Sequence, residues 1–270
     1  MISLVAIALI VLAAVFAPWL TPHEGAGGTG TPDLATAFGA PSLEHPFGTD
    51  DLGRDVFARV LFGARPSLVL GAVVVTLGMV IGTGLGAVAG FAGGWIDEII
   101  MRFTDIILSF PALLLAILLA ATLRPSLESA IVAISVTWWP WYTRLVRAQA
   151  VSIRERHYVL AARSLGASPL WVLWHHVLPN VLGPVRVQAA LDLGAAILVG
   201  AALSFLGLGS QPPSPDWGRM VSDGRQYVLG GYWWLTVFPG AAIYVTALTF
   251  SFLGDGVQKA SDPRARGMSS

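Results

Sequence analysis

The apolar positions of this chain fall into six long runs, and the polar positions gather between them. The runs cover roughly residues 2–20, 68–91, 99–123, 129–151, 185–208 and 232–253. A helix needs about 20 mainly apolar residues to cross the hydrocarbon core of a membrane, so each run predicts one spanning helix. The pattern therefore predicts an all-α integral membrane protein with six transmembrane helices and no large soluble domain.

The first run is predicted to be a retained helix rather than a cleaved signal peptide. A signal peptide combines a basic segment, a short apolar segment and a cleavage site of small residues. Here no basic residue precedes the run, the apolar stretch is long, and no small-x-small site ends it.

The composition agrees with a membrane protein and excludes several other classes. Only 12% of the 270 residues are charged, and 16 basic side chains balance 16 acidic ones, whereas a soluble domain carries about 25% charged residues. A free nucleic-acid binder is disfavoured because there is no excess of basic residues. With no cysteine in the chain, disulfide frameworks, iron–sulfur clusters and zinc–thiolate sites are excluded.

The charges between the runs predict which side of the membrane each loop occupies. Because the number of runs is even, both termini share one side. If that side is the cytoplasm, the loop between runs four and five, its borders and the C-terminal tail carry nine basic and three acidic residues, while the opposite side carries six basic and nine acidic ones. Loops rich in Lys and Arg stay on the cytoplasmic side, so an N-in, C-in orientation is predicted.

Four glycines form a ladder in the second run. Gly78, Gly82, Gly86 and Gly90 recur every fourth residue, which places them on one face of a helix. Small residues at this spacing let another backbone approach closely in lipid. The ladder predicts close helix packing, either within the chain, which is the simpler interpretation, or against another subunit.

Two further residues interrupt the apolar runs. Pro111 is predicted to kink or break the third helix. Asp192 lies early in the fifth run, where a carboxylate usually faces a cavity or a partner group. Because Asp192 is the only acid of its run, a proton relay is disfavoured, and a structural or cavity-lining role is predicted.

The segment between the fourth and fifth runs is predicted to hold a short helix bounded by its own residues. Ser152 with Glu155 matches the capping box that begins a helix, and Gly166 matches a C-terminal stop. The apolar face of this helix has the spacing i, i+3, i+4, i+7 and consists of Tyr158, Ala161, Ala162 and Leu165.

A second helix is predicted over residues 170–178. Ser168 can cap it, Pro169 suits its first position, and Pro179 is predicted to end it. Together the two helices can either lie on the anionic inner leaflet or dock a cytoplasmic protein. The small Ala161–Ala162 pair favours docking, but physical chemistry alone leaves the two interpretations open.

The acidic segment before the second run is predicted to be structural. His45, Asp50, Asp51 and Asp55 are metal-ligand types, but their spacing matches neither an EF-hand nor a zinc site. A turn that opens an amphipathic helix over residues 52–61 is predicted instead. The chain also lacks the sequences GxxxxGK[ST], HExxH and GxSxG, so it is predicted not to be an enzyme and not to hydrolyse ATP itself.

The loop between runs four and five resembles the EAA loop of ABC-importer permeases. That loop has the pattern Glu-Ala-Ala, three residues, Gly, nine residues, Ile, one residue, Leu-Pro, and here Ala161-Ala162, Gly166 and Leu178-Pro179 match it. Leu160 stands in place of the Glu, and His176 in place of the Ile. The sequence from His176 to Asn180 is similar to the His-Ile-Leu-Pro-Asn of the peptide branch.

Other segments resemble the dipeptide, oligopeptide and nickel permeases, and most closely the C-type subunit of dipeptide systems. The similarity extends from about residue 40 to the C-terminus. The matching segments are 45–59, 63–68, 203–209, 211–213, 216–218, 252–256 and 262–264.

The resemblance implies a type I ABC importer permease fold in the cell inner membrane and a set of partners. These are a second homologous permease subunit in a heterodimer, two ABC ATPase subunits that hold ATP and Mg, and an extracytoplasmic substrate-binding protein, which would meet the polar segment 209–231. The implied substrate is a di- or oligopeptide, and no cofactor is expected in this chain and no nucleic acid as partner. Nickel uptake is the alternative, followed by a stand-alone secondary carrier and a membrane enzyme.

The resemblance also divides the chain and assigns its coupling residues. It implies a first helix with an extracytoplasmic segment over 1–66, a permease core over 67–255 with a cytoplasmic coupling loop at about 152–180, and a cytoplasmic tail over 256–270. The residues implied to couple the permease to the ATPases are Tyr158, Leu160, Ala161, Ala162, Gly166, Ala167, Leu178 and Pro179.

Overall fold

A computed structural model describes residues 2–21, 30 and 32–261 of the chain, and every regular element in these ranges is helical. Four of the charged residues counted for the orientation, Glu24, Asp262, Arg264 and Arg266, lie outside the described residues. The helices are α1 (Ile2–Leu20), η1 (Leu34–Thr36), α2 (Val56–Ala92), α3 (Gly94–Leu108), α4 (Ala112–Thr122), α5 (Leu127–Arg154), α6 (His157–Ser164), α7 (Pro169–Val172), a π turn η2 (Leu173–Val177), α8 (Leu178–Phe205), α9 (Trp217–Gly224), η3 (Arg225–Gly230) and α10 (Trp234–Ser261).

Four of these helical segments are long and apolar enough to cross a membrane, and a bent pair would make a fifth. The four are Ser3–Leu20, Val56–Ala92, Pro169–Phe205 and Trp234–Ala260, and the pair is α3 with α4. The fourth predicted span is helical, as α5, but three tryptophans near the middle of this helix and three arginines in its second half lower its hydropathy. The count of six spans therefore stays a prediction.

The predicted break at Pro111 is confirmed. α3 ends at Leu108, α4 begins at Ala112, and the two axes differ by 84°. Pro111 lacks the N–H that would continue the ladder of hydrogen bonds, and the Ser109 hydroxyl donates to the carbonyl of Ile106 at 2.6 Å.

The separate helix predicted over residues 52–61 is wrong. The helix begins only at Val56, where the Asp55 carboxylate accepts the N–H of Ala58 at 3.1 Å, and it continues unbroken to Ala92. Pro66 lies inside this helix without ending it. The proline removes only one backbone hydrogen-bond donor, and packing against neighbouring helices keeps the chain helical there.

The glycine ladder of α2 packs against α5 within this chain. A Cβ on Gly82, Gly86 or Gly90 would come within 2.5–2.6 Å of a carbonyl oxygen of α5, and one on Gly78 would lie 3.3 Å from Trp138. Hydrogen in place of a side chain is therefore what allows the two helices to lie this close.

Arg65 of α2 holds α1 by hydrogen bonds to two carbonyls, one of which a proline leaves without its helical donor. Pro18 lacks an N–H, so the carbonyl of Ala14 has no helical donor four residues on. Arg65 of α2 replaces that donor, with Nε at 2.7 Å from the Ala14 oxygen and Nη2 at 3.1 Å from the Val15 oxygen.

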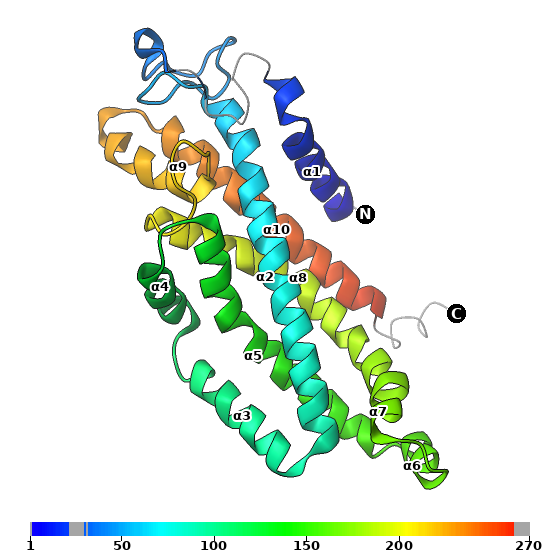
Figure 1. The fold of residues 1–270 in the computed structure, drawn as a ribbon. Coiled ribbons are helices and arrows are strands. Elements are labelled where there is room, and N and C mark those ends of the chain that lie inside the picture. The colour runs from blue at the N-terminus through cyan, green and yellow to red at the C-terminus, as the bar shows by residue number, and fades with distance from the viewer. Residues whose placement is uncertain (1, 22–29, 31, 262–270) are drawn as a thin grey trace.

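The long helices run between two ends of the molecule (Figure 1). The short helices α6 and α7 lie at one end. The segment before α2, together with α9, lies at the other, where buried Trp217 donates its indole N–H to Val60 at 2.8 Å. The end that holds α6 and α7 and the end that holds α9 are therefore far apart, and α2, α5 and α8 connect them.

Candidate functional site

The helix α6 is anchored by its inner face and closed by a glycine. Val159 is fully buried in a cluster with Ile153, Val172 and Val177. At the C-terminus, Ala167 N donates to Ala162 O and Gly166 N to Arg163 O, both at 3.0 Å, with Gly166 at φ +87°. This is the Schellman closure that favours glycine, so the predicted stop at Gly166 is confirmed.

The predicted start of α6 is wrong. Ser152 lies inside α5, which continues to Arg154, and α6 begins at His157 after Arg156, whose side chain makes no capping hydrogen bond. The packing of Ile153 in the core carries α5 through the expected capping box, and tertiary packing of this kind commonly overrides a local cap signal.

The second helix starts as predicted but does not end at Pro179. Ser168 accepts the N–H of Trp171 at 3.3 Å, and Pro169 occupies the first turn. The chain then passes through the π turn Leu173–Val177 into α8, where Pro179 again lies in a first turn. The π turn changes the hydrogen-bond register just before Pro179, and the chain stays helical from α7 through α8.

The outward surface of α6 and α7, here called the α6–α7 surface, is exposed and hollowed. Tyr158 and Leu160 are each 46% exposed, and Leu165 is 89% exposed. A hollow of about 450 Å³ is lined by Ala162, Leu165, Gly166, Ala167, Ser168 and Trp171.

The predicted coupling residues divide between this surface and the core. Ala161 and Pro179 are exposed, whereas Ala167 and Leu178 pack against the buried valines. Trp171 was missed by sequence reasoning. Its signal was a large aromatic side chain directly after the Ser168–Pro169 helix start.

Two ion pairs connect α5, just before this surface, to α3. The Arg147 guanidinium contacts both oxygens of Asp97, at 2.5 and 2.6 Å, and Arg144 Nη2 lies 2.6 Å from Asp105 Oδ1. Asp97 lies in the first turn of α3. A movement of α5 would therefore be transmitted to α3.

Asp192 lies between α5 and α8. Trp138 Nε1 donates to one of its oxygens at 3.2 Å, and Gln188 Nε2 donates to the other at 2.8 Å. Gln188 stands one helical turn earlier on α8, a spacing that was readable in the sequence. The carboxylate thus ties the two helices that flank the α6–α7 surface.

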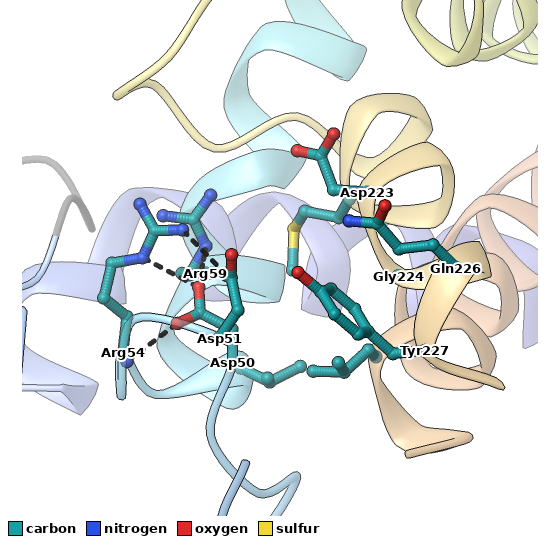
Figure 2. Close-up of a pocket in the computed structure, with 11 residues that line it drawn as sticks. Asp50, Asp51, Arg54, Arg59, Asp223, Gly224, Gln226 and Tyr227 are labelled. Carbon is teal, nitrogen blue, oxygen red and sulfur yellow. Dashed lines mark hydrogen bonds and ion pairs between the residues drawn. The ribbon is translucent and has the colours of Figure 1, made fainter. Parts of the chain in front are cut away.

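A second polar site lies at the opposite end of the molecule, between the start of α2 and α9 (Figure 2). This α2–α9 pocket has a volume of about 260 Å³. It is lined by Asp50, Asp51, Arg54, Val56, Arg59, Met220, Asp223, Gly224, Gln226, Tyr227 and Leu235. The sequence correctly placed Asp50 and Asp51 in a turn but did not show that α9 and η3 cover them.

The acids before α2 form a compact ionic turn. Asp50 accepts the N–H of Leu52 and of Arg54 at 2.9 Å each and the Arg54 Nε–H at 2.7 Å, while Arg59 Nε lies 3.6 Å away. His45 Nδ1 lies 2.9 Å from Asp55. Among the described residues, no group of three or more His, Cys, Asp or Glu side chains could hold a metal ion.

Asp216, at the start of α9, is a second buried acid at this end, beside Asp50. Burial raises the pKa of its carboxyl above the ordinary value. The N–H of Arg219, the Ser204 hydroxyl, the N–H of Gly218 and the Ser210 hydroxyl oppose that shift by hydrogen bonding. The same carboxylate caps α9 by accepting the Arg219 N–H at 3.1 Å.

Comparison with known families gives two matches. Residues 82–267 match the family described as the binding-protein-dependent transport system inner membrane component, and residues 1–44 match the N-terminal transmembrane domain of oligopeptide transport permease C.

Similar proteins cover almost the whole chain. A probable D,D-dipeptide transport system permease protein, DdpC of Escherichia coli, is 47% identical over 99% of this chain and 88% of its own. The dipeptide transport system permease protein DppC of Alkalihalophilus pseudofirmus is 45% identical over 98% of this chain and 86% of its own. Among solved structures, the inward-facing MetNI methionine ABC transporter shares the fold, with a TM-score of 0.62 and 20% identity over 76% of this chain and 97% of that one.

Proposed function

The chain belongs to the inner membrane components of binding-protein-dependent transport systems, and we propose that it forms part of the translocation pathway of an ATP-driven importer of di- or oligopeptides. It is a multi-pass inner-membrane transport subunit of the ABC permease class. The peptide substrate is supported by the names of the two similar permeases, which cover almost all of this chain.

We propose six spans with both termini in the cytoplasm. The spans are α1, α2, the bent pair of α3 and α4, α5, α8 and α10. Support comes from the basic residues around α6 and α7, since positively charged loops remain inside. The α6–α7 surface would then face the cytoplasm, and the α2–α9 pocket the exterior.

The α6–α7 surface is the proposed contact for a partner ATPase, and its exposed hollow beside Leu165 is the observation that carries the proposal. Two ATPase subunits would bind and hydrolyse ATP with Mg, and each would insert side chains against one permease. Because α6 follows α5 directly and α7 continues into α8, closure of the ATPases would move both helices. The bundle would then open toward a loaded binding protein outside.

A second homologous permease would complete the pathway, because each permease chain supplies one coupling surface and the two ATPases need one each. The polar segment 209–231, which includes α9, is proposed to meet the extracytoplasmic binding protein. The exposed apolar side chains of α1 are proposed to face lipid.

The coupling role is tested with two substitutions in purified, reconstituted complexes. Ala161→Arg places a charged side chain on the exposed surface, and Gly166→Pro destroys the closure of α6. Both proteins should insert and assemble, while ATP hydrolysis no longer drives uptake. Arg163→Ala, on the opposite face of α6, is the matched control and should retain uptake. Normal uptake by Ala161→Arg would contradict the assignment.

The substrate is tested by uptake of labelled dipeptides, oligopeptides and nickel ions into cells that lack the chain and cells that regain it. Peptide uptake that requires ATP supports the proposal. Nickel uptake alone, or uptake driven by an ion gradient without ATPases, would contradict it.

A further inference from the structure

The α2–α9 pocket is closed at its base. Val56, Met220 and Leu235 are 1%, 8% and 6% exposed, and they come from α2, α9 and α10. The deepest acid, Asp50, is already bound by Arg54 and by backbone N–H groups. A molecule that enters this pocket therefore meets a blind end and has no route into the helix bundle.

The rim of the pocket is acidic. The side chains of Asp51 and Asp223 are 42% and 57% exposed, whereas those of Arg54 and Arg59 are 15% and 9% exposed. Both arginines lie against Asp50, and Arg54 Nη2 also lies 3.9 Å from Asp51 Oδ1. The two aspartates are nevertheless more exposed than the arginines, so a group that approaches from solvent meets carboxylates first. Figure 2 shows the Tyr227 side chain reaching from η3 toward Asp51, which adds an aromatic face beside the acids.

The lining as a whole has one excess negative charge, from three aspartates and two arginines. Arg219 offsets Asp223 from outside the pocket, with Nε 2.9 Å from Oδ1, but an exposed pair one helical turn apart is weak. A lysine or arginine suits such a site, because its apolar stem can lie against Met220 and Tyr227 while its charge meets the rim.

We propose that the α2–α9 pocket receives a lysine or arginine side chain of the extracytoplasmic binding protein. This inference rests on the proposed function, which places the pocket outside. The transported peptide is disfavoured as occupant because the pocket is blind. The pocket's small volume admits one long side chain rather than a segment of a folded protein.

The charge preference of the rim can be measured without the binding protein, because this chain has no cysteine of its own to react. In the assembled complex, Gln226→Cys places one thiol on the rim, and Leu43→Cys places one on a fully exposed loop. Each is labelled with the trimethylammonioethyl and the sulfonatoethyl methanethiosulfonate. The cation-to-anion ratio of rates should be about fivefold higher at residue 226 than at residue 43 and should fall on adding salt or Asp223→Asn. Equal ratios at the two positions would overturn the proposal.

The second measurement uses the loaded binding protein that activates the wild-type complex. Asp223→Asn should raise the concentration for half-maximal stimulation of ATP hydrolysis about fivefold, in line with loss of a rim charge pair. Arg219→Gln should lower that concentration or leave it unchanged, because it exposes the Asp223 charge. Glu44→Gln, an exposed acid outside the pocket, is the control and should have no effect.

The outcomes separate the possible failures. If Asp223→Asn and Arg219→Gln weaken binding equally, the acid serves only its local ion pair, and the proposal is wrong. Protection of Gln226→Cys by free peptide would assign the pocket to substrate instead. If no binding protein stimulates the wild-type complex, the proposed function fails as well, whereas stimulation that is unchanged in every rim variant overturns the pocket's role alone.

Discussion

Two glycines have open space where a Cβ would sit but differ in backbone conformation. Gly166 has φ +87°, and Gly183 lies inside α8 without a positive φ. Gly166→Ala should cost about 1 kcal/mol locally, because a left-handed conformation penalises a Cβ. Gly183→Ala should be neutral or stabilise by about 0.5–1 kcal/mol, since alanine favours helices.

Hydrogen–deuterium exchange of the α6 amides measures this difference. Faster exchange in Gly166→Ala and unchanged exchange in Gly183→Ala are expected. Equal protection of α6 in the two variants would show that the closure at Gly166 contributes nothing to the helix.

Asp216 predicts a dependence of stability on pH. Burial raises the pKa of its carboxyl in the folded protein, so the folded state holds this proton more tightly than the unfolded state. The contribution of protonated Asp216 to the free energy of unfolding is therefore complete below the ordinary aspartate pKa and is lost as pH rises through the raised value. Asp216→Asn keeps an acceptor for the Arg219 N–H and should equal or exceed wild type in thermal stability at pH 7. Its advantage should vanish near pH 4. Asp216→Ala should lose about 1 kcal/mol from the missing cap.

For single residues, the sequence correctly predicted roles that depend only on the neighbouring backbone. The Gly166 stop and the Ser168 cap depend on nearby backbone alone and were readable. The capping box at Ser152 failed because burial of Ile153, through contacts distant in sequence, extends α5. The sequence could not show that Asp223 and Asp51 line the same pocket, because only the folded chain brings α9 over the start of α2.

Among the elements, α2 and α5 depend on the glycine ladder for their contact. Gly86→Ala should destabilise the protein by about 1–3 kcal/mol, because the new Cβ would overlap the carbonyl of Thr143 and force the helices apart. Gly84→Ala lies on the same helix with open space around it and should be harmless. Thermal unfolding in detergent compares the two, and equal midpoints would contradict the close contact.

Element boundaries were predicted where a residue breaks the helix and missed where packing overrides it. Pro111 ended α3 as expected, while Pro66 and Pro179 did not end their helices. The difference lies in their surroundings. Pro179 follows the π turn Leu173–Val177, where the hydrogen-bond register changes, whereas Pro66 lies in a helix held on several sides by its neighbours.

For the whole molecule, the proposed orientation predicts which surfaces meet an impermeant thiol reagent in intact cells. Leu165 and Leu43 are almost fully exposed at the α6–α7 end and the α9 end, respectively. A single cysteine at residue 43 should react from outside, and one at residue 165 only after the cells are opened and the ATPase subunits are removed from the membrane. Labelling of residue 165 in intact cells would reverse the proposed topology.

The continuous helix from Pro169 to Phe205 also has a mechanical consequence. Its 37 residues make a rod of about 55 Å at 1.5 Å per residue, with α7 at the proposed ATPase contact and α8 extending away from it. If the rod pivots at the π turn Leu173–Val177, the arm beyond the pivot is α8, whose 28 residues span about 42 Å, and a tilt of about 10° would displace its tip by about 7 Å. Under the proposed coupling, a small displacement of α7 would therefore produce a larger displacement at the far end of α8.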